Sequence, residues 1–374
     1  MPLHGARAIV TGTVAAKTPI VDAHLDMAGN VLIGRDHFVR ASVVRKTDDK
    51  RRPKCMVTLR ELEAGGVAIA FATLFTGTNR FDDDGVGIYK TPPEEDARRQ
   101  LDVYLGWEAD GHARIIRSRA DLAGHLESWE SDGLLGIVVL IEGGESIRSP
   151  DALPEWWDAG VRIIGPAWSG TRYCGGTRRP GPLTPMGREL IAGMRDLGFI
   201  LDMSHMAEQS FWDAIDVGPG RTIASHSNVR ELVPGDAIMD GSRQLSDDQI
   251  RAIGDLDGVI GLNLFNGFLT PEYAAGIAGR LLTGLVYPGE QEQVENNVTL
   301  DVVRAHAEHI ADLIGWQRVG IGSDLDGGLG RDETPVELDT AADLVRVGDV
   351  APPEARAGVL GENWLRLLRE ALPA

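Results

Sequence analysis

The sequence contains little sulfur and no long apolar run. Its two cysteines, Cys55 and Cys174, are too few for a disulfide framework and form no Cys-x-x-Cys metal motif. Free thiols are typical of a reducing compartment, so we expect a cytoplasmic protein. No apolar segment approaches the roughly 20 residues that span a bilayer, and the first residues lack the charged-then-apolar pattern of a secretion signal. We therefore expect no membrane partner.

An excess of basic residues is also absent. The formal net charge is -19 at pH 7, from 37 Lys and Arg against 56 Asp and Glu. This balance argues against nucleic acid as a partner. Hydrophobic residues make up 43% and charged residues 25% of the 374 residues, which is ordinary for a soluble globular protein. The length fits one large domain, because barrels often run this long.

The chain has eight apolar segments, most of which alternate with segments of helical pattern. Continuous apolar runs are typical of parallel strands that are buried on both faces. The repeat predicts an α/β protein of the (β/α)8, TIM-barrel type, as a single domain at 19–374 after an N-terminal arm or short strand at 1–18. An open doubly wound sheet is the alternative, but no Gly-x-Gly-x-x-Gly follows any strand. The strands are expected at 20–24, 67–74, 134–141, 161–166, 199–203, 222–225, 259–264 and 319–322.

Three other features of the sequence are less specific. The basic stretch 35–54 reads as a solvated surface loop, although a lid attracting an anionic substrate is the alternative. The stretch 273–292 could serve as a flap. His306 and His309 share one predicted helix, but their spacing matches no helical zinc motif, so we expect them at the surface.

Polar side chains close several of the predicted strands, where a barrel carries its active site. His24 and Asp26 lie two positions apart at the first strand, so in extended chain both side chains point the same way and can reach one metal ion. Taken alone, a His-x-Asp pair also fits a capped strand end followed by a turn. The other strand ends that carry such side chains are Glu142, His205, His226 and Asp324.

The number of candidate ligands favours two metal ions. Three imidazoles and two carboxylates exceed what one tetrahedral zinc ion needs, since a catalytic zinc keeps an open position. Two ions that share a bridging carboxylate fit better, and they would hold a water molecule as hydroxide near neutral pH. A carboxylated lysine cannot be the bridge, because none of the five lysines closes a predicted strand. Glu142 is the natural bridge, which leaves Asp324 as general base and acid.

Five stretches of the chain resemble the membrane (renal-type) dipeptidase family of metallopeptidases. Their order and spacing match over most of residues 19–370. The resemblance implies a (β/α)8 barrel with a binuclear zinc site that cleaves dipeptides, and it implies a homodimer. The stretches are Val21-Asp22-Ala23-His24-Leu25-Asp26, Ile141-Glu142-Gly143-Gly144, Leu201-Asp202-Met203-Ser204-His205, Ala224-Ser225-His226-Ser227-Asn228 and Gly322-Ser323-Asp324-Leu325-Asp326-Gly327.

The resemblance also implies a role for each ligand. It places one zinc ion on His24, Asp26 and Glu142, and the other on Glu142, His205 and His226. The family's acid/base position falls on Asp324, in agreement with the ligand count.

Two further positions concern the substrate. Arg243 matches the family arginine that binds the substrate's C-terminal carboxylate, a sensible use of a bidentate guanidinium. The alternative is a surface arginine before a helix. Trp168 stands where the family often has a histidine that helps to stabilise the oxyanion. An indole donates one hydrogen bond but carries no charge, and losing an oxyanion donor can cost about 10²–10³ in rate.

The replacement by Trp168 leaves several interpretations open: polarisation by the metals alone, an unusual substrate, low activity, or a role of the indole as a pocket wall. We predict a zinc-dependent dipeptidase with two Zn²⁺ per chain and a dipeptide-like substrate. A related binuclear enzyme acting on another small amide, ester or lactone is one alternative. A metal-binding barrel without peptidase turnover is the other.

Overall fold

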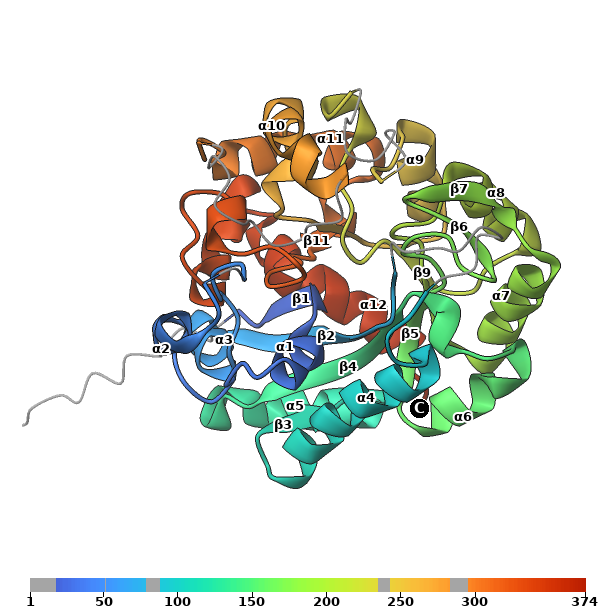
Figure 1. The fold of residues 1–374 in the computed structure, drawn as a ribbon, viewed down its shortest axis with the longest axis horizontal. Coiled ribbons are helices and arrows are strands. Elements are labelled where there is room, and N and C mark those ends of the chain that lie inside the picture. Colours follow the sequence, from blue (N-terminus) through green and yellow to red (C-terminus); the bar gives the residue numbers. More distant parts are fainter. Residues whose placement is uncertain (1–17, 51, 79–87, 235–242, 283–294) are drawn as a thin grey trace, which may run out of the picture.

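A ring of parallel strands forms the centre of the protein (Figure 1). The computed structural model describes residues 18–50, 52–78, 88–234, 243–282 and 295–374. The strands follow the order β10-β11-β1-β2-β4-β5-β8-β9, and the ring closes where Ala224 pairs with Ile260 in parallel. Their bounds are β1 Ile20–Leu25, β2 Val67–Phe75, β4 Leu135–Glu142, β5 Val161–Gly165, β8 Ile200–Asp202, β9 Thr222–Ile223, β10 Ile260–Leu262 and β11 Val319–Ile321. The predicted (β/α)8 barrel is confirmed.

Helices surround this ring (Figure 1). One of them begins with a capping box, in which the Ser246 hydroxyl accepts the Gln249 N–H and the Gln249 side chain accepts the Ser246 N–H. The helices are α1 Met27–Leu32, α2 Ala41–Thr47, α3 Leu59–Gly65, α4 Pro93–Ala109, α5 Arg119–Asp132, α6 Leu153–Asp158, α7 Pro185–Leu197, α8 Glu208–Val217, α9 Asp247–Asp255, α10 Pro271–Leu282, α11 Leu300–Ile314 and α12 Asn363–Ala371.

Three short strands were not expected from the sequence. Strand β3, Ala113–Ile115, pairs in parallel with β4. Strands β6, Cys174–Gly176, and β7, Arg179–Leu183, form a separate antiparallel hairpin between β5 and α7. These strands are too short, and the hairpin too rich in glycine, to show an alternating or continuous apolar pattern. The turn of this hairpin places Thr177 next to His205, which follows β8.

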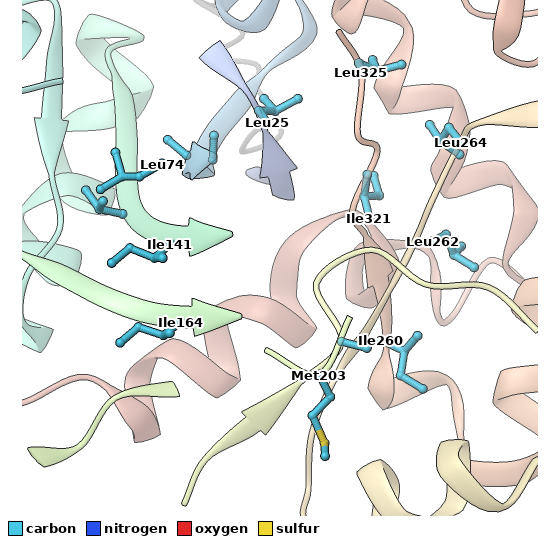
Figure 2. Close-up of a cluster of buried hydrophobic side chains, with 14 of the residues drawn as sticks. Leu25, Leu74, Ile141, Ile164, Met203, Ile260, Leu262, Leu264, Ile321 and Leu325 are labelled. Carbon is cyan, nitrogen blue, oxygen red and sulfur yellow. The ribbon is translucent and has the colours of Figure 1, made fainter. Parts of the chain in front are cut away.

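On β2 and β4, side chains on the two faces of the strand belong to two apolar clusters. On β2, Ala70, Ala72 and Leu74 belong to the large cluster, part of which Figure 2 shows on successive strands of the ring. Ile69 and Phe71 belong to a second cluster, which also contains Trp364 of α12. Successive side chains of a strand point to opposite faces. Helix α12 therefore packs on the face of β2 opposite the large cluster.

The strand face that contributes to the second cluster also carries polar side chains at the carboxyl ends of several strands. On β4, Leu140 of this cluster precedes Glu142 by two positions. On β8, Ile200 precedes Asp202, and on β9 Ile223 precedes Ser225 in the same way. Side chains two positions apart share a face of a strand. On β4, β8 and β9, the apolar core residue and the polar residue that follows it therefore lie on the same face.

The expected surface loop at 35–54 is wrong in two respects. Residues 41–47 form helix α2. Arg35 is buried, with 5% of its surface exposed, and its guanidinium contacts Asp48 at 2.8 Å and Asp326 at 3.3 Å. Arg40 does remain exposed. Arg35 is therefore an internal ion-pair partner, and its contact with Asp326 connects this segment to the loop that follows Asp324.

The expected surface position of His306 is also wrong. Its side chain is fully buried, accepts the backbone N–H of Val229 at 3.1 Å, and contacts the carbonyl oxygen of Leu269 at 3.1 Å. His309 is partly exposed and pairs with Asp247. Residues 1–17 and 283–294 lie outside the described residues, so the predicted arm at 1–18 and the flap at 273–292 stay predictions.

Candidate metal centre

Glu142 lies between histidines from three other parts of the ring. Its Oε2 is 3.2 Å from His24 Nε2, and its Oε1 is 3.1 Å from His205 Nε2 and 3.6 Å from His226 Nε2. The four side chains are buried, with at most 7% of any residue exposed. Glu142 ends β4, whereas His24 lies on β1, and His205 and His226 follow β8 and β9. The closed ring brings these strand ends together.

Asp26 joins this cluster from the end of β1. The Thr73 hydroxyl of β2 donates a hydrogen bond to Asp26 Oδ1. Ligand atoms of His24, Asp26 and Glu142 lie within 4.8 Å of one another. The structure thus brings together the first ligand set that the sequence predicts, from strands β1 and β4.

The second predicted set is brought together in the same way. Ligand atoms of Glu142, His205 and His226 also lie within 4.8 Å of one another, and the Nε2 atoms of the two histidines are 3.0 Å apart. Glu142 is the one residue that both sets share. A carboxylate with one oxygen facing each set has the geometry of a bridge between two ions.

The protonation states of Glu142, His205 and His226 suit metal binding. The pKa of His24 is instead raised to about 10, because burial, which lowers it, is outweighed by the charge of Glu142 and the hydrogen bond to it. Burial raises the pKa of Glu142, but the charge of His24 and hydrogen bonds from His205 and His24 outweigh burial and hold it well below its usual value. Burial and neighbouring cations lower the pKa of His205 to about 4 and that of His226 well below its usual value. An ionised carboxylate and neutral imidazoles are the forms that bind a metal ion.

Crowding of carboxylates also fits a positive ion at this point. Burial and then repulsion from Glu142 raise the pKa of Asp26 to about 6. Asp324 Oδ1 and Asp26 Oδ2 both approach Gly327, where an added Cβ would lie 1.9 Å and 2.9 Å from them. Cations placed among these oxygens would relieve the repulsion, so the donor set fits one or more divalent ions.

Asp324 lies beside this cluster and is held by its own contacts. Its Oδ2 accepts a hydrogen bond from Asn263 Nδ2 at 3.0 Å, and the Asn263 Oδ1 accepts the Phe265 N–H at 2.7 Å. The amide of Asn263 is thereby oriented with its donor toward the carboxylate. Burial raises the pKa of Asp324 to about 8; His24 opposes this shift, and Asp26 adds to it.

Strained backbone marks this end of the barrel. His205, Asp324 and Asp326 have φ of 65°, 60° and 63°, in the left-handed region that non-glycine residues seldom adopt. Such conformations persist where surrounding contacts over-determine them, and they are enriched at functional sites. The backbone therefore turns the His205 imidazole and the Asp324 carboxylate to their places at a conformational cost.

Arg243 is buried against the same cluster. Only 2% of its surface is exposed. Its Nη2 donates to the carbonyl oxygen of His226 at 2.6 Å, its Nη1 donates to Ser227 Oγ at 3.2 Å, and its guanidinium lies over the ring of Phe268 at 4.8 Å. The alternative of a surface arginine is therefore wrong. Its charge contributes to the lowered pKa of His205, which places a fixed cation next to the candidate site.

Trp168 forms an aromatic wall with Phe75 beside His205. The two rings pack edge to face, with centroids 5.1 Å apart, and the Trp168 centroid is 6.2 Å from that of His205. Phe75 ends β2 opposite Glu142. The Gln100 amide holds its backbone by accepting the Phe75 N–H at 2.9 Å and donating to its carbonyl at 2.7 Å. Both rings are half-buried, so this wall is partly accessible.

Several residues at the site were not predicted. Asp202 and Ser225 lie inside the stretches that carry the resemblance, and their two-residue spacing from Ile200 and Ile223 is the signal that could have found them. Asn263 follows β10 and could have been found as a polar strand end. Thr177, whose Oγ1 lies 2.8 Å from His205 Nδ1, comes from the unexpected hairpin and has no such signal.

Comparisons with known proteins agree with this architecture. Residues 10–373 match the model of the membrane dipeptidase family, peptidase family M19. A protein of uncharacterised function from the pqqA 5′ region of Klebsiella pneumoniae is 30% identical over 274 residues, which cover 69% of this chain and 89% of that protein. The dipeptidase tcpJ of Claviceps purpurea is 24% identical over 363 residues, which cover 89% and 74%.

Two solved structures share the fold. The metallopeptidase named dipeptidase AC has a TM-score of 0.74 at 24% identity, over 95% of this chain and 99% of that chain. A metallopeptidase from Rhodobacter sphaeroides, liganded with a phosphinate mimic of L-Ala-D-Ala, has a TM-score of 0.72 at 22% identity over the same shares. Among the described residues, no helix has the length and apolar character to cross a membrane. Since the family match extends over nearly the whole chain, this protein belongs to the membrane dipeptidase family of metallopeptidases.

Proposed function

We propose that this protein is a zinc-dependent dipeptidase whose two ions share Glu142. The observation that carries the proposal is the pair of ligand sets, joined by one carboxylate, at the carboxyl end of a closed barrel. Active sites of such barrels lie at this end. Family membership supports the reaction class, and the structural relative from Rhodobacter sphaeroides carries a mimic of a dipeptide.

The proposed ligands divide as the sequence predicts. His24, Asp26 and Glu142 would hold one ion, and Glu142, His205 and His226 the other. When bound, the ions supply a Lewis acid for the amide carbonyl and lower the pKa of a water molecule. The chain's own contribution is a buried donor set, in which burial and neighbouring cations lower the pKa of His205 and His226.

Asp324 is proposed to carry the proton. It would accept the proton of the attacking water and deliver it to the amine that leaves, as a general base and then a general acid. The raised pKa of Asp324 and its contact with Asn263 suit a group that must both accept and release a proton. Its carboxylate and that of Asp26 both lie close to Gly327.

Arg243 and Trp168 are proposed to bind the substrate from two sides. The buried Arg243 guanidinium would pair with the substrate's C-terminal carboxylate, since its charge lies beside His226 and Phe268. The wall of Trp168 and Phe75 would contact an apolar substrate side chain. The indole would thus act in binding, where many family members have a charged oxyanion donor.

Asp324→Asn tests the proton carrier. We expect kcat for a mixed library of L-X-L-Y and L-X-D-Y dipeptides to fall by about 10²–10⁴, because an amide cannot accept the proton, while zinc content stays at the wild-type value. Asp248→Asn is the control, since this side chain is 81% exposed on α9, and it should change nothing. An Asp324→Asn variant with more than a tenth of wild-type turnover would remove Asp324 from this role.

Arg243→Lys separates a dipeptidase from an enzyme for other amides, esters or lactones. We expect KM for free dipeptides to rise about tenfold to a hundredfold, since a hydrogen bond to a charged group contributes about 1.5–3 kcal/mol and lysine lacks the bidentate fork. Dipeptide amides, which have no carboxylate, should bind equally to both proteins. An equal loss for both substrate types would contradict the carboxylate contact.

Trp168→Ala tests the aromatic wall. Partial loss of one apolar contact should cost about 1–2 kcal/mol, so kcat/KM for dipeptides with Leu or Phe should fall about five- to thirtyfold relative to Gly-Gly. Trp212→Ala, on α8 and partly buried, is the matched control and should leave this ratio unchanged. A uniform fall for all dipeptides after Trp168→Ala would indicate an effect on the reacting centre instead of side-chain binding.

A further inference from the structure

One buried hydroxyl contacts a ligand of each proposed metal position. Ser225 Oγ lies 3.2 Å from His24 Nδ1 and 2.7 Å from His226 Nδ1, and it donates to Asp202 Oδ2 at 2.5 Å. At most 1% of the surface of any of these four residues is exposed. His24 belongs to the first ligand set, and His226 belongs to the second.

Hydrogen-bond counting indicates where the proton of Ser225 lies. Ser204 Oγ is also 3.4 Å from Ser225 Oγ, a longer contact than those to the two histidines. A serine hydroxyl has one proton and two lone pairs. The Ser225 hydroxyl donates to Asp202 Oδ2, and Asp202 Oδ1 accepts the N–H groups of Ser204 at 3.0 Å and Ser225 at 2.9 Å. The Ser225 proton therefore points to Asp202. Its lone pairs then accept from His24 Nδ1–H and His226 Nδ1–H.

This arrangement presents both Nε2 lone pairs to the proposed metal site. With its proton on Nδ1, a neutral imidazole leaves Nε2 free to bind a metal ion. The Nε2 atoms of His24 and His226 are the ones that face Glu142. The two rings are also stacked, with centroids 3.6 Å apart and planes 28° apart.

We propose that Ser225, oriented by Asp202, is a shared positioning residue that fixes the tautomers of His24 and His226 and so couples the two metal positions. Partners of this kind typically contribute 10- to 100-fold to metal affinity. Here one hydroxyl serves two ligands that belong to different ions. The inference rests on the proposed function, because it concerns the same ligand sets.

His205 has a different hydroxyl partner and therefore provides a comparison. Thr177 Oγ1 lies 2.8 Å from His205 Nδ1, and His205 belongs to the second ligand set alone. Removal of the Thr177 hydroxyl should therefore weaken one metal position. Removal of the Ser225 hydroxyl should weaken both together, although each substitution deletes a single hydroxyl next to a histidine.

Asp202→Asn tests the direction of the proton chain. The Asn oxygen would keep the two backbone N–H contacts, and its NH₂ would then face Ser225 as a donor. The Ser225 proton would have to turn toward one histidine, whose Nδ1 would become an acceptor and whose proton would move to Nε2. That ring could no longer bind a metal ion through Nε2, although the shape of the site is unchanged.

The experiment measures zinc affinity by competition with a chromophoric chelator, and histidine tautomers by selective ¹⁵N NMR of the metal-free protein. We expect two zinc sites in wild type, and both should weaken about 10- to 100-fold in Ser225→Ala and Asp202→Asn. In Thr177→Val only one should weaken. The Nδ1–H signals of His24 and His226 should be present in wild type, and at least one should be lost in Asp202→Asn.

The outcomes separate this inference from the proposed function. Wild type without two zinc sites would contradict the proposed function itself. Two wild-type sites, with Ser225→Ala weakening neither or only one, would overturn the shared role. Unchanged tautomers in Asp202→Asn would also overturn it. If Ser225→Ala fails to fold, the isosteric Asp202→Asn decides the matter, with thermal unfolding of the metal-free variants as the check on folding.

Discussion

The contact on which the site depends is the buried carboxylate of Glu142 among three imidazoles. Burying an ionised carboxylate is costly unless positive or hydrogen-bonding partners surround it. Glu142 meets His24 through one oxygen, and His205 and His226 through the other. Because these partners come from three separate strands, the carboxylate is stabilised only when the barrel is complete. Folding and assembly of the candidate metal site are therefore one process.

Closure of the barrel imposes a steric constraint next to this carboxylate. The ring closes between β9 and β10 beside Ser225, whose carbonyl oxygen approaches two neighbouring strands. A Cβ on Gly261 would lie 1.9 Å from this oxygen, and a Cβ on Gly322 would lie 1.7 Å from it. Glycine is required at both positions because the backbones approach so closely. The same close packing sets Ser225 between His24 and His226.

The barrel and the candidate ligands could be predicted from local sequence, because both depend on apolar segments and on the residues that end them. An apolar run that ends in a polar residue identifies a strand and, at the same time, a side chain at the barrel mouth, as for Glu142 and His226. Other features depend on contacts between distant segments. The burial of Arg35 follows from its pairing with Asp326, and that of His306 from its contacts with Val229 and Leu269. Thr177 reaches His205 only through a hairpin without a sequence pattern.

The most direct test of the account is the number of zinc ions that the metal-free protein binds. Calorimetric titration with Zn²⁺ should give two sites per chain, and Glu142→Gln should weaken both, because a neutral amide cannot bridge two ions. Loss of a single site in Glu142→Gln, or one site in the wild-type protein, would contradict a shared carboxylate as the centre of this structure.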